Sequence, residues 1–106
     1  MGLKVGVVVN QKKHGAAELL AKLHSWLAKR DAEVLDTTNN ALEEVLKEAS
    51  LIICLGGDGT LLSVADQMKE PSIPVLGVNL GSLGFLTEVK EGEIFEELNA
   101  FFSGSA

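Results

Sequence analysis

Residues Leu51–Thr60 read LIICLGGDGT, an apolar run that passes directly into a glycine-rich turn with an aspartate at its centre. An unbroken apolar run of this length is typical of a strand that is buried on both faces of a parallel sheet. Thr60 has the side chain of a good N-cap, which predicts a helix over residues 61–69. A buried strand that leads through a glycine turn into a helix favours an α/β fold.

The same alternation of strand and helix continues on both sides of this stretch. Strand-forming runs predict strands over residues 3–9, 33–35, 51–55 and 75–78. The helical spacing of apolar residues predicts helices over residues 16–31, 42–49, 61–69 and 91–102, with Asn40 as the cap of the second. Because parallel strands are joined by right-handed crossovers, we expect an open three-layer α/β sandwich, Rossmann-like, with a mainly parallel sheet. The order of the strands cannot be read from this pattern.

The composition fits one small domain. A chain of 106 residues, 46% hydrophobic and 23% charged, can bury a core and is long enough for one compact domain but too short for two. The single Cys54 excludes an internal disulfide framework and a cysteine-rich zinc site. No apolar run approaches the ~20 residues of a membrane span, and the first residues lack a signal-peptide core, so we expect a cytoplasmic domain without membrane contact. The formal net charge of −6 argues against a general nucleic-acid binder.

Six of the eleven glycines lie between Gly56 and Gly84, in two loops and the strand that joins them. In an open α/β sheet, ligands bind at the carboxyl ends of strands, and glycines there let backbone N–H groups approach an anion closely. The expected occupant is a phosphate, held by Gly56, Gly57, Gly59 and Thr60. Neither a P-loop motif nor a complete G-x-G-x-x-G motif occurs, since position 62 is leucine.

Asp58 stands at the centre of the glycine loop, where an acid beside bound phosphates is unfavourable unless a metal or a reacting hydroxyl offsets it. A carboxylate in this place can accept a proton from an attacking hydroxyl, or orient that hydroxyl for in-line phosphoryl transfer. The alternative is an Asx-turn that only shapes the loop. The buried strand before Asp58 and the helix after it favour a functional site.

Several further polar residues have weaker functional interpretations. Lys12, Lys13 and His14 follow the first strand at the same predicted edge, where they could help to neutralise a polyphosphate, although residue type alone favours a solvated loop. We expect His24 on the surface of a helix and Cys54 as an inert thiol inside a buried strand.

Two segments together resemble the amino-terminal domain of the NAD kinase family: Gly56–Thr60 (GGDGT) and Gly77–Thr87 (GVNLGSLGFLT). The resemblance extends over the whole chain. The first segment is shared with diacylglycerol and sphingosine kinases and approximately with phosphofructokinases, so by itself it indicates a superfamily. The second is more specific, because a lipid kinase is expected to have a Gly-Thr-Gly-Asn-Asp type of segment there.

The resemblance implies a fold of the phosphofructokinase/NAD kinase type and transfer of a phosphoryl group from ATP or polyphosphate to the 2′-hydroxyl of the adenosine ribose of NAD, giving NADP. It implies Asp58 as the proton acceptor and a homo-oligomeric full-length enzyme. Phosphoryl transfer makes a divalent ion, Mg²⁺, the expected cofactor, with ligands that the sequence does not identify. The positions matched to the NAD site are Asp58, Gly59, Leu62, Leu83 and Phe85.

The family also has a second, β-rich carboxyl-terminal domain with an Asn-Glu pair that holds NAD. Residues 1–106 contain no such pair, since Glu97-Leu98-Asn99 lies on the last predicted helix and does not match it. We therefore expect residues 1–106 to be the amino-terminal domain, inactive by itself. Two alternatives stay open: a relative of the lipid kinases or phosphofructokinases, and a nucleotide-binding module without turnover.

Overall fold

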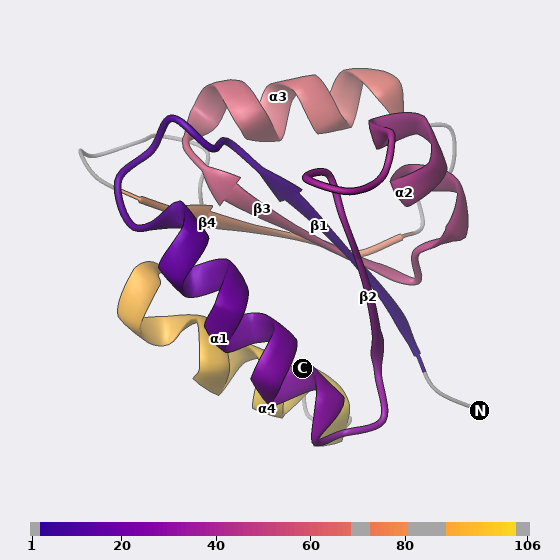
Figure 1. Cartoon of the computed structure of the whole chain (residues 1–106), viewed down its shortest axis with the longest axis vertical. Coiled ribbons are helices and arrows are strands. Elements are labelled where there is room, and N and C mark those ends of the chain that lie inside the picture. Colours follow the sequence, from indigo (N-terminus) through magenta and orange to yellow (C-terminus); the bar gives the residue numbers. More distant parts are fainter. Residues whose placement is uncertain (1–2, 69–72, 81–88, 104–106) are drawn as a thin grey trace.

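The computed structural model describes residues 3–68, 73–80 and 89–103. They form a five-stranded sheet in the order β2-β1-β3-β4-β5, in which every strand pair is parallel (Figure 1). The strands are β1 (Lys4–Val9), β2 (Glu33–Asp36), β3 (Leu51–Gly56), β4 (Val75–Asn79) and β5 (Val89–Lys90). The helices are α1 (Ala16–Ala28), α2 (Leu42–Glu48), α3 (Asp58–Gln67) and α4 (Ile94–Ser103), with a short 3₁₀ turn, η1 (Glu91–Glu93), before α4.

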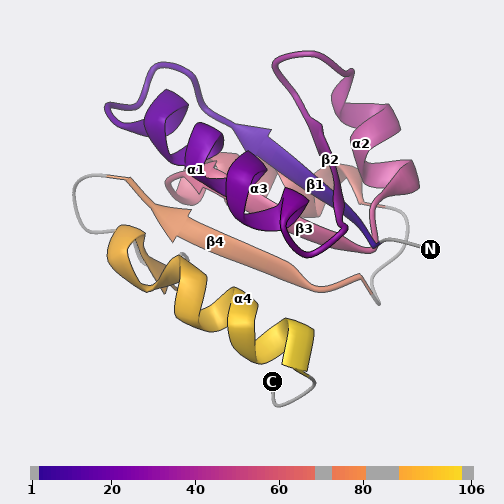
Figure 2. The same ribbon diagram turned by 60° about the horizontal axis from the view of Figure 1, so that its bottom comes forward.

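Two pairs of helices cover the two faces of the sheet, α1 and α4 on one and α2 and α3 on the other (Figures 1 and 2). The central strand β3 is buried along its whole length, and its side chains alternate between the faces. Leu51, Ile53 and Leu55 join the core under α1 and α4. Ile52 and Cys54 join the core under α2 and α3. The expected three-layer sandwich is confirmed, and burial on both faces explains why residues 51–55 are apolar throughout.

The predicted cap of the third helix is wrong. The helix α3 begins at Asp58 with Gly57 as its N-cap, so Thr60 is the third helical residue and not the cap. Gly57 has an extended backbone (φ −147°, ψ −159°), and its carbonyl accepts a hydrogen bond of 3.2 Å from the Leu61 N–H. The helix therefore starts as soon as β3 ends, which brings Asp58 into its first turn.

The predicted cap of the second helix is also wrong. Ala41 is the N-cap of α2, and the Asn40 side-chain amide instead donates to the Asp36 carbonyl at 3.1 Å. The Asn40 side chain therefore helps to close the turn that follows β2.

The carboxyl ends of β1, β3 and β4 meet at one edge of the sheet. Beyond the last residue of β1, the Asn10 N–H donates to the Leu55 carbonyl at 2.9 Å, which continues the pairing of β1 with β3. On the other side of β3, Gly56 pairs with Asn79, and its carbonyl accepts a 2.9 Å hydrogen bond from the Leu80 N–H. The GGDGT turn, which follows β3, thus leaves the sheet between the ends of its neighbouring strands β1 and β4. The second glycine-bearing loop, at residues 81–84, lies outside the described residues.

Candidate functional site

A hollow of about 540 Å³ lies at this edge, between the loop that follows β1 and the beginning of α3. Both elements contribute to its walls. The lining residues are Val8, Val9, Asn10 and Lys13 from the β1 side, and Gly57, Asp58, Gly59, Thr60 and Ser63 from the α3 side. Four consecutive residues of the glycine motif, 57–60, therefore line one hollow.

Gly56 and Gly59 of the loop differ in whether the structure leaves room for a side chain. A Cβ on Gly56 would lie 3.1 Å from the Asn10 Cβ and would collide with the Thr60 hydroxyl, so tight packing excludes a side chain there. A Cβ on Gly59 would meet nothing within 4 Å, and Gly59 is exposed. Packing therefore does not require glycine at position 59. A bare backbone in the first turn of a helix is, however, suited to close contact with an anion.

Asp58 is the first residue of α3 and is half-buried in the wall of the hollow. The positive end of the helix dipole stabilises a carboxylate in the first turn in its charged form, which is the form that accepts a proton. N–H groups in this turn have no acceptor within the helix itself. The hollow combines a proton acceptor with anion-directed N–H donors, and phosphoryl transfer to a hydroxyl needs both.

Not every predicted site residue lines the hollow. Gly56 is buried beneath the turn and is not part of the lining. Leu62 is 55% exposed and lies on the surface of α3, outside the lining. Leu83 and Phe85 lie outside the described residues. The assignment of these three side chains to an NAD site stays a prediction.

Asn10 and Ser63 also line the hollow, and sequence reasoning missed both. Each has a signal in the sequence. Asn10 directly follows the first predicted strand, at the edge where ligands are expected. Ser63 follows Gly59 by four residues, which places Gly59 and Ser63 on one side of a helix. Among the three polar residues considered after the first strand, Lys13 lines the hollow, whereas Lys12 and His14 are exposed outside it. Lys12 and His14 thus fit the solvated-loop interpretation, whereas Lys13 is half-buried in the lining of the hollow.

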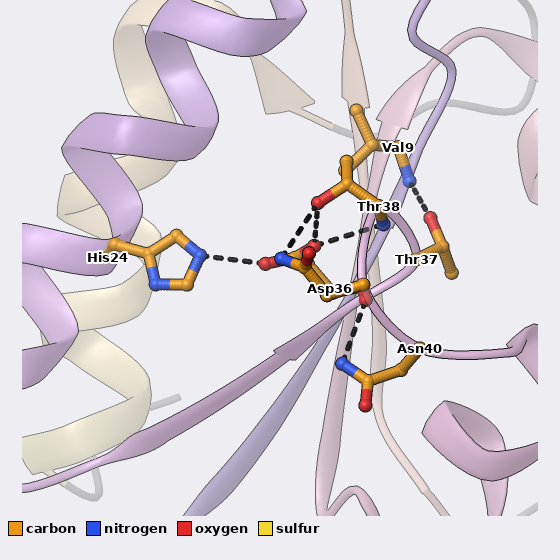
Figure 3. Close-up of polar contacts among 7 residues, drawn as sticks. Val9, His24, Asp36, Thr37, Thr38 and Asn40 are labelled. Atoms are coloured by element: carbon orange, nitrogen blue, oxygen red, sulfur yellow. Dashed lines mark hydrogen bonds and ion pairs between the residues drawn. The ribbon is translucent and has the colours of Figure 1, made fainter.

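A second polar cluster surrounds Asp36, the buried last residue of β2 (Figure 3). Its Oδ2 atom lies 2.8 Å from Nε2 of His24 on α1. Its Oδ1 atom accepts hydrogen bonds from the Thr38 N–H, at 3.0 Å, and from the Thr38 hydroxyl. Next to this pair, the Val9 N–H donates to the Thr37 hydroxyl oxygen at 3.0 Å. The turn after β2 is therefore bound to both α1 and β1.

Burial raises the pKa of the Asp36 carboxyl, but the hydrogen bonds from Thr38 and the contact with His24 outweigh burial and lower this pKa below its ordinary value of 3.8. His24 is 46% exposed, so it does lie at the surface as predicted, but it also anchors a buried carboxylate. Sequence reasoning missed this pair because the two residues are 12 positions apart on different elements. The cluster does not line the hollow.

Cys54 is buried in β3 as expected, and burial raises the pKa of its thiol to about 12. Among the described residues, no group of three His, Cys, Asp or Glu side chains is placed to hold a metal ion. Within the same ranges, no helix has both the length and the apolar character that crossing a membrane demands.

The family model of the ATP-NAD kinase N-terminal domain matches residues 9–106 of this chain. A NAD kinase of Heliobacterium modesticaldum is 40% identical over 110 residues, which cover 94% of this chain and 39% of that protein. A NAD kinase of Oleidesulfovibrio alaskensis is 44% identical over 89 residues, which cover 81% of this chain and 30% of that protein. The chain thus spans well under half the length of these curated relatives.

The same fold occurs in the crystal structure of yeast NADH kinase complexed with NADH. The TM-score is 0.70 at 19% sequence identity, and the match covers 99% of this chain and 39% of that one. This likeness supports the α/β architecture, while the family model and the relatives decide between the kinase families that share GGDGT. The chain belongs to the NAD kinase family and corresponds to its N-terminal domain.

Proposed function

We propose that this domain takes part in phosphorylating NAD at the 2′-hydroxyl of its adenosine ribose, which gives NADP, with ATP or polyphosphate as the phosphoryl donor. One observation carries the proposal. In a chain of the NAD kinase family, the Asp58 carboxylate begins a helix inside a hollow that Gly57, Gly59 and Thr60 also line. A proton acceptor and phosphate-directed N–H groups are thereby adjacent.

Asp58 is the proposed proton acceptor. Its carboxylate orients the ribose 2′-hydroxyl and accepts the proton of that hydroxyl as the new bond to phosphorus forms. The proposed phosphate-binding residues, whose backbone stabilises the charge on the transferred group, are Gly56, Gly57, Gly59 and Thr60. The proposed NAD-binding residues are Asp58, Gly59, Leu62, Leu83 and Phe85.

Mg²⁺ is the proposed cofactor. Asp58 is the carboxylate among the residues that line the hollow, and the described residues offer no cluster of three ligands. Because Asp58 is assigned to the proton of the acceptor hydroxyl, the ion would be held by the phosphates of the donor and by waters, which Mg²⁺ commonly keeps as ligands. When bound, the ion neutralises negative charge on the transferred phosphoryl group.

The proposed enzyme is larger than this domain, because the chain covers 39% of the Heliobacterium modesticaldum relative. We propose that a β-rich carboxyl-terminal domain completes the NAD site and that the full-length enzyme is a homo-oligomer. Its small-molecule partners are NAD and the phosphoryl donor, and the cytoplasm, which contains both, is its proposed location.

The test is the substitution Asp58→Asn in an enzyme in which the carboxyl-terminal portion of the Heliobacterium modesticaldum relative continues this chain. Asparagine keeps the shape of the side chain but cannot accept the proton. We expect kcat to fall by about 10²–10⁴-fold, nearer the lower value because a loose transition state needs little early deprotonation. The KM for ATP should change far less. NADP formation is measured with NAD, Mg²⁺ and either ATP or polyphosphate, which also identifies the donor.

Asp66→Asn is the matched control, because Asp66 lies on the same helix, is exposed and is not part of the lining. It removes the same charge and should leave kcat unchanged. Near-normal turnover by the Asp58→Asn enzyme would remove Asp58 from the mechanism. Failure of the unsubstituted enzyme to form NADP would favour a nucleotide-binding module without turnover.

A further inference from the structure

The loop that follows β1 is held in place by backbone hydrogen bonds. The Asn10 N–H bonds to the Leu55 carbonyl at 2.9 Å, and the Asn10 carbonyl accepts the Lys13 N–H at 3.1 Å. The Lys13 carbonyl in turn accepts the N–H of Ala16, the first residue of α1, at 3.3 Å. Gly15 supplies the positive φ of 85° with which the chain enters that helix. The backbone of Lys13 is therefore fixed between a central strand and a helix.

The Lys13 side chain extends from this turn across the glycine loop. It is half-buried, and both its Cε and its Nζ atom lie 4.0 Å from the place where a Cβ on Gly57 would stand. The ammonium group therefore lies beside the backbone of Gly57, in the lining of the hollow. Lys12, its neighbour in sequence, is exposed and outside the lining.

The charge of Lys13 is not neutralised by a carboxylate within the part of the chain that the structure describes. The ion pairs formed there are Lys4 with Glu48 and His24 with Asp36. Lys13 and Asp58 are the charged residues of the lining. In a chain of net charge −6, a hollow that carried only the Asp58 carboxylate would repel a polyphosphate, and the ammonium group offsets that repulsion.

Lys13 and Asp58 line the hollow from different elements, Lys13 from the loop after β1 and Asp58 from the start of α3. Donor and acceptor must approach the transferred phosphorus from opposite sides. With the acceptor hydroxyl at Asp58, the donor phosphates belong on the side of the loop after β1, where Lys13 lies.

We infer that Lys13 is a binding residue for the phosphates of the phosphoryl donor, whether these belong to a nucleoside triphosphate or to inorganic polyphosphate. This inference rests on the proposed function and adds a residue and a direction of approach to it. The ammonium group contacts the non-bridging oxygens of the donor, while Asp58 faces the acceptor hydroxyl.

The test is a titration of the ¹⁵N-labelled 106-residue chain, followed through the amide signals of Gly57 and Gly59. The probes are tripolyphosphate and, in a second arm, ATP. Lys13→Gln should raise the dissociation constant about tenfold, as expected for the loss of a charge-assisted contact. Lys12→Gln is the matched control, since it removes the same charge one residue away, and it should change binding less than twofold. Lys13→Arg keeps the charge and should restore most of the affinity.

Loss of affinity in both arms identifies the phosphate chain itself as the ligand, and loss in the ATP arm alone identifies the nucleotide. Equal effects of the Lys12 and Lys13 substitutions, unchanged binding by Lys13→Gln, or no binding by the unsubstituted chain would each overturn the inference. NADP formation is a separate measurement. It is made with this chain continued by the carboxyl-terminal portion of the Heliobacterium modesticaldum relative. If that longer enzyme forms no NADP while the titration depends on Lys13, the proposed function is contradicted and this inference stands.

Discussion

At the scale of single residues, Asp36 illustrates how a buried charge is retained. Removing a carboxylate from water disfavours its ionised form, yet the hydrogen bonds from Thr38 and the contact with His24 more than compensate. The fold is therefore linked to the charged state of this side chain, and that linkage makes stability depend on pH.

We expect this contribution to disappear in acid. Because the folded pKa of Asp36 lies below its ordinary value of 3.8, the contribution is complete well above 3.8 and is lost as the pH falls through the folded pKa. Asp36→Asn should lower the free energy of unfolding by about 1–3 kcal/mol at pH 7, and the difference from the unsubstituted chain should shrink below pH 3.8. Urea unfolding of both proteins from pH 2 to pH 7 measures how this difference in the free energy of unfolding changes with pH. Asp66→Asn serves as the exposed control, and a pH-independent difference would contradict the linkage.

At the scale of elements, the close approach of α2 to β1 depends on Gly6. A Cβ at this buried position would lie 2.7 Å from the Val45 Cγ1 atom and 2.9 Å from the Ala49 Cβ atom. Both neighbours belong to the core under α2 and α3, so neither can move into solvent. The helix α2 therefore packs closely against β1 at Gly6, where β1 has no side chain.

Gly6→Ala should therefore destabilise the chain by about 1–3 kcal/mol through overpacking. Gly92→Ala is the matched control, because a Cβ there would meet nothing within 4 Å. Chemical unfolding of the two variants compares them directly. A Gly6→Ala variant as stable as Gly92→Ala would mean that α2 shifts away from the sheet without cost.

On the other face, aromatic side chains join α1 to α4. The ring of Trp26 lies 5.8 Å from that of Phe95 and 5.7 Å from that of Phe102, centroid to centroid, and Arg30 stacks on Trp26 at 3.4 Å. The ring of Trp26 packs at the margin of the core under α1 and α4. The terminal helix is thereby docked by contacts within this chain.

At the scale of the whole molecule, the described residues form two cores, one on each face of the sheet. This burial leads us to expect that the 106-residue chain unfolds in a single cooperative transition. We also expect it to form no NADP by itself. The relatives are much longer, and loss of the groups that orient NAD removes a contribution of up to roughly 7–11 kcal/mol to lowering the barrier.

The measurement is a coupled assay for NADP with the purified chain, ATP, Mg²⁺ and NAD, next to the same chain continued by the carboxyl-terminal portion of its relative. Turnover that follows the 106-residue chain through purification and disappears in Asp58→Asn would place the whole catalytic site within these residues. Calorimetry on the same sample checks that the chain is folded.

The sequence by itself was sufficient for the strands β1 to β4, for the helices α1 to α4 and for the edge at which the site lies, but it missed the two-residue strand β5. Burial on both faces makes Leu51–Leu55 apolar throughout, and a 3.6-residue period marks a helix wherever one face is buried. Both signals are local, so they can be read from neighbouring residues. Because every parallel strand ends at the same edge, they also indicate where the GGDGT turn emerges.

Only the tertiary structure decided the strand order, the start of α3 at Asp58, and the residues that face the turn. Lys12 and Lys13 are equivalent in a sequence, and they differ once the pairing of β1 with β3 determines which side chain crosses Gly57. His24 and Asp36 likewise become partners only when α1 packs beside the end of β2. These outcomes depend on contacts between segments far apart in the chain, and no local periodicity encodes such contacts.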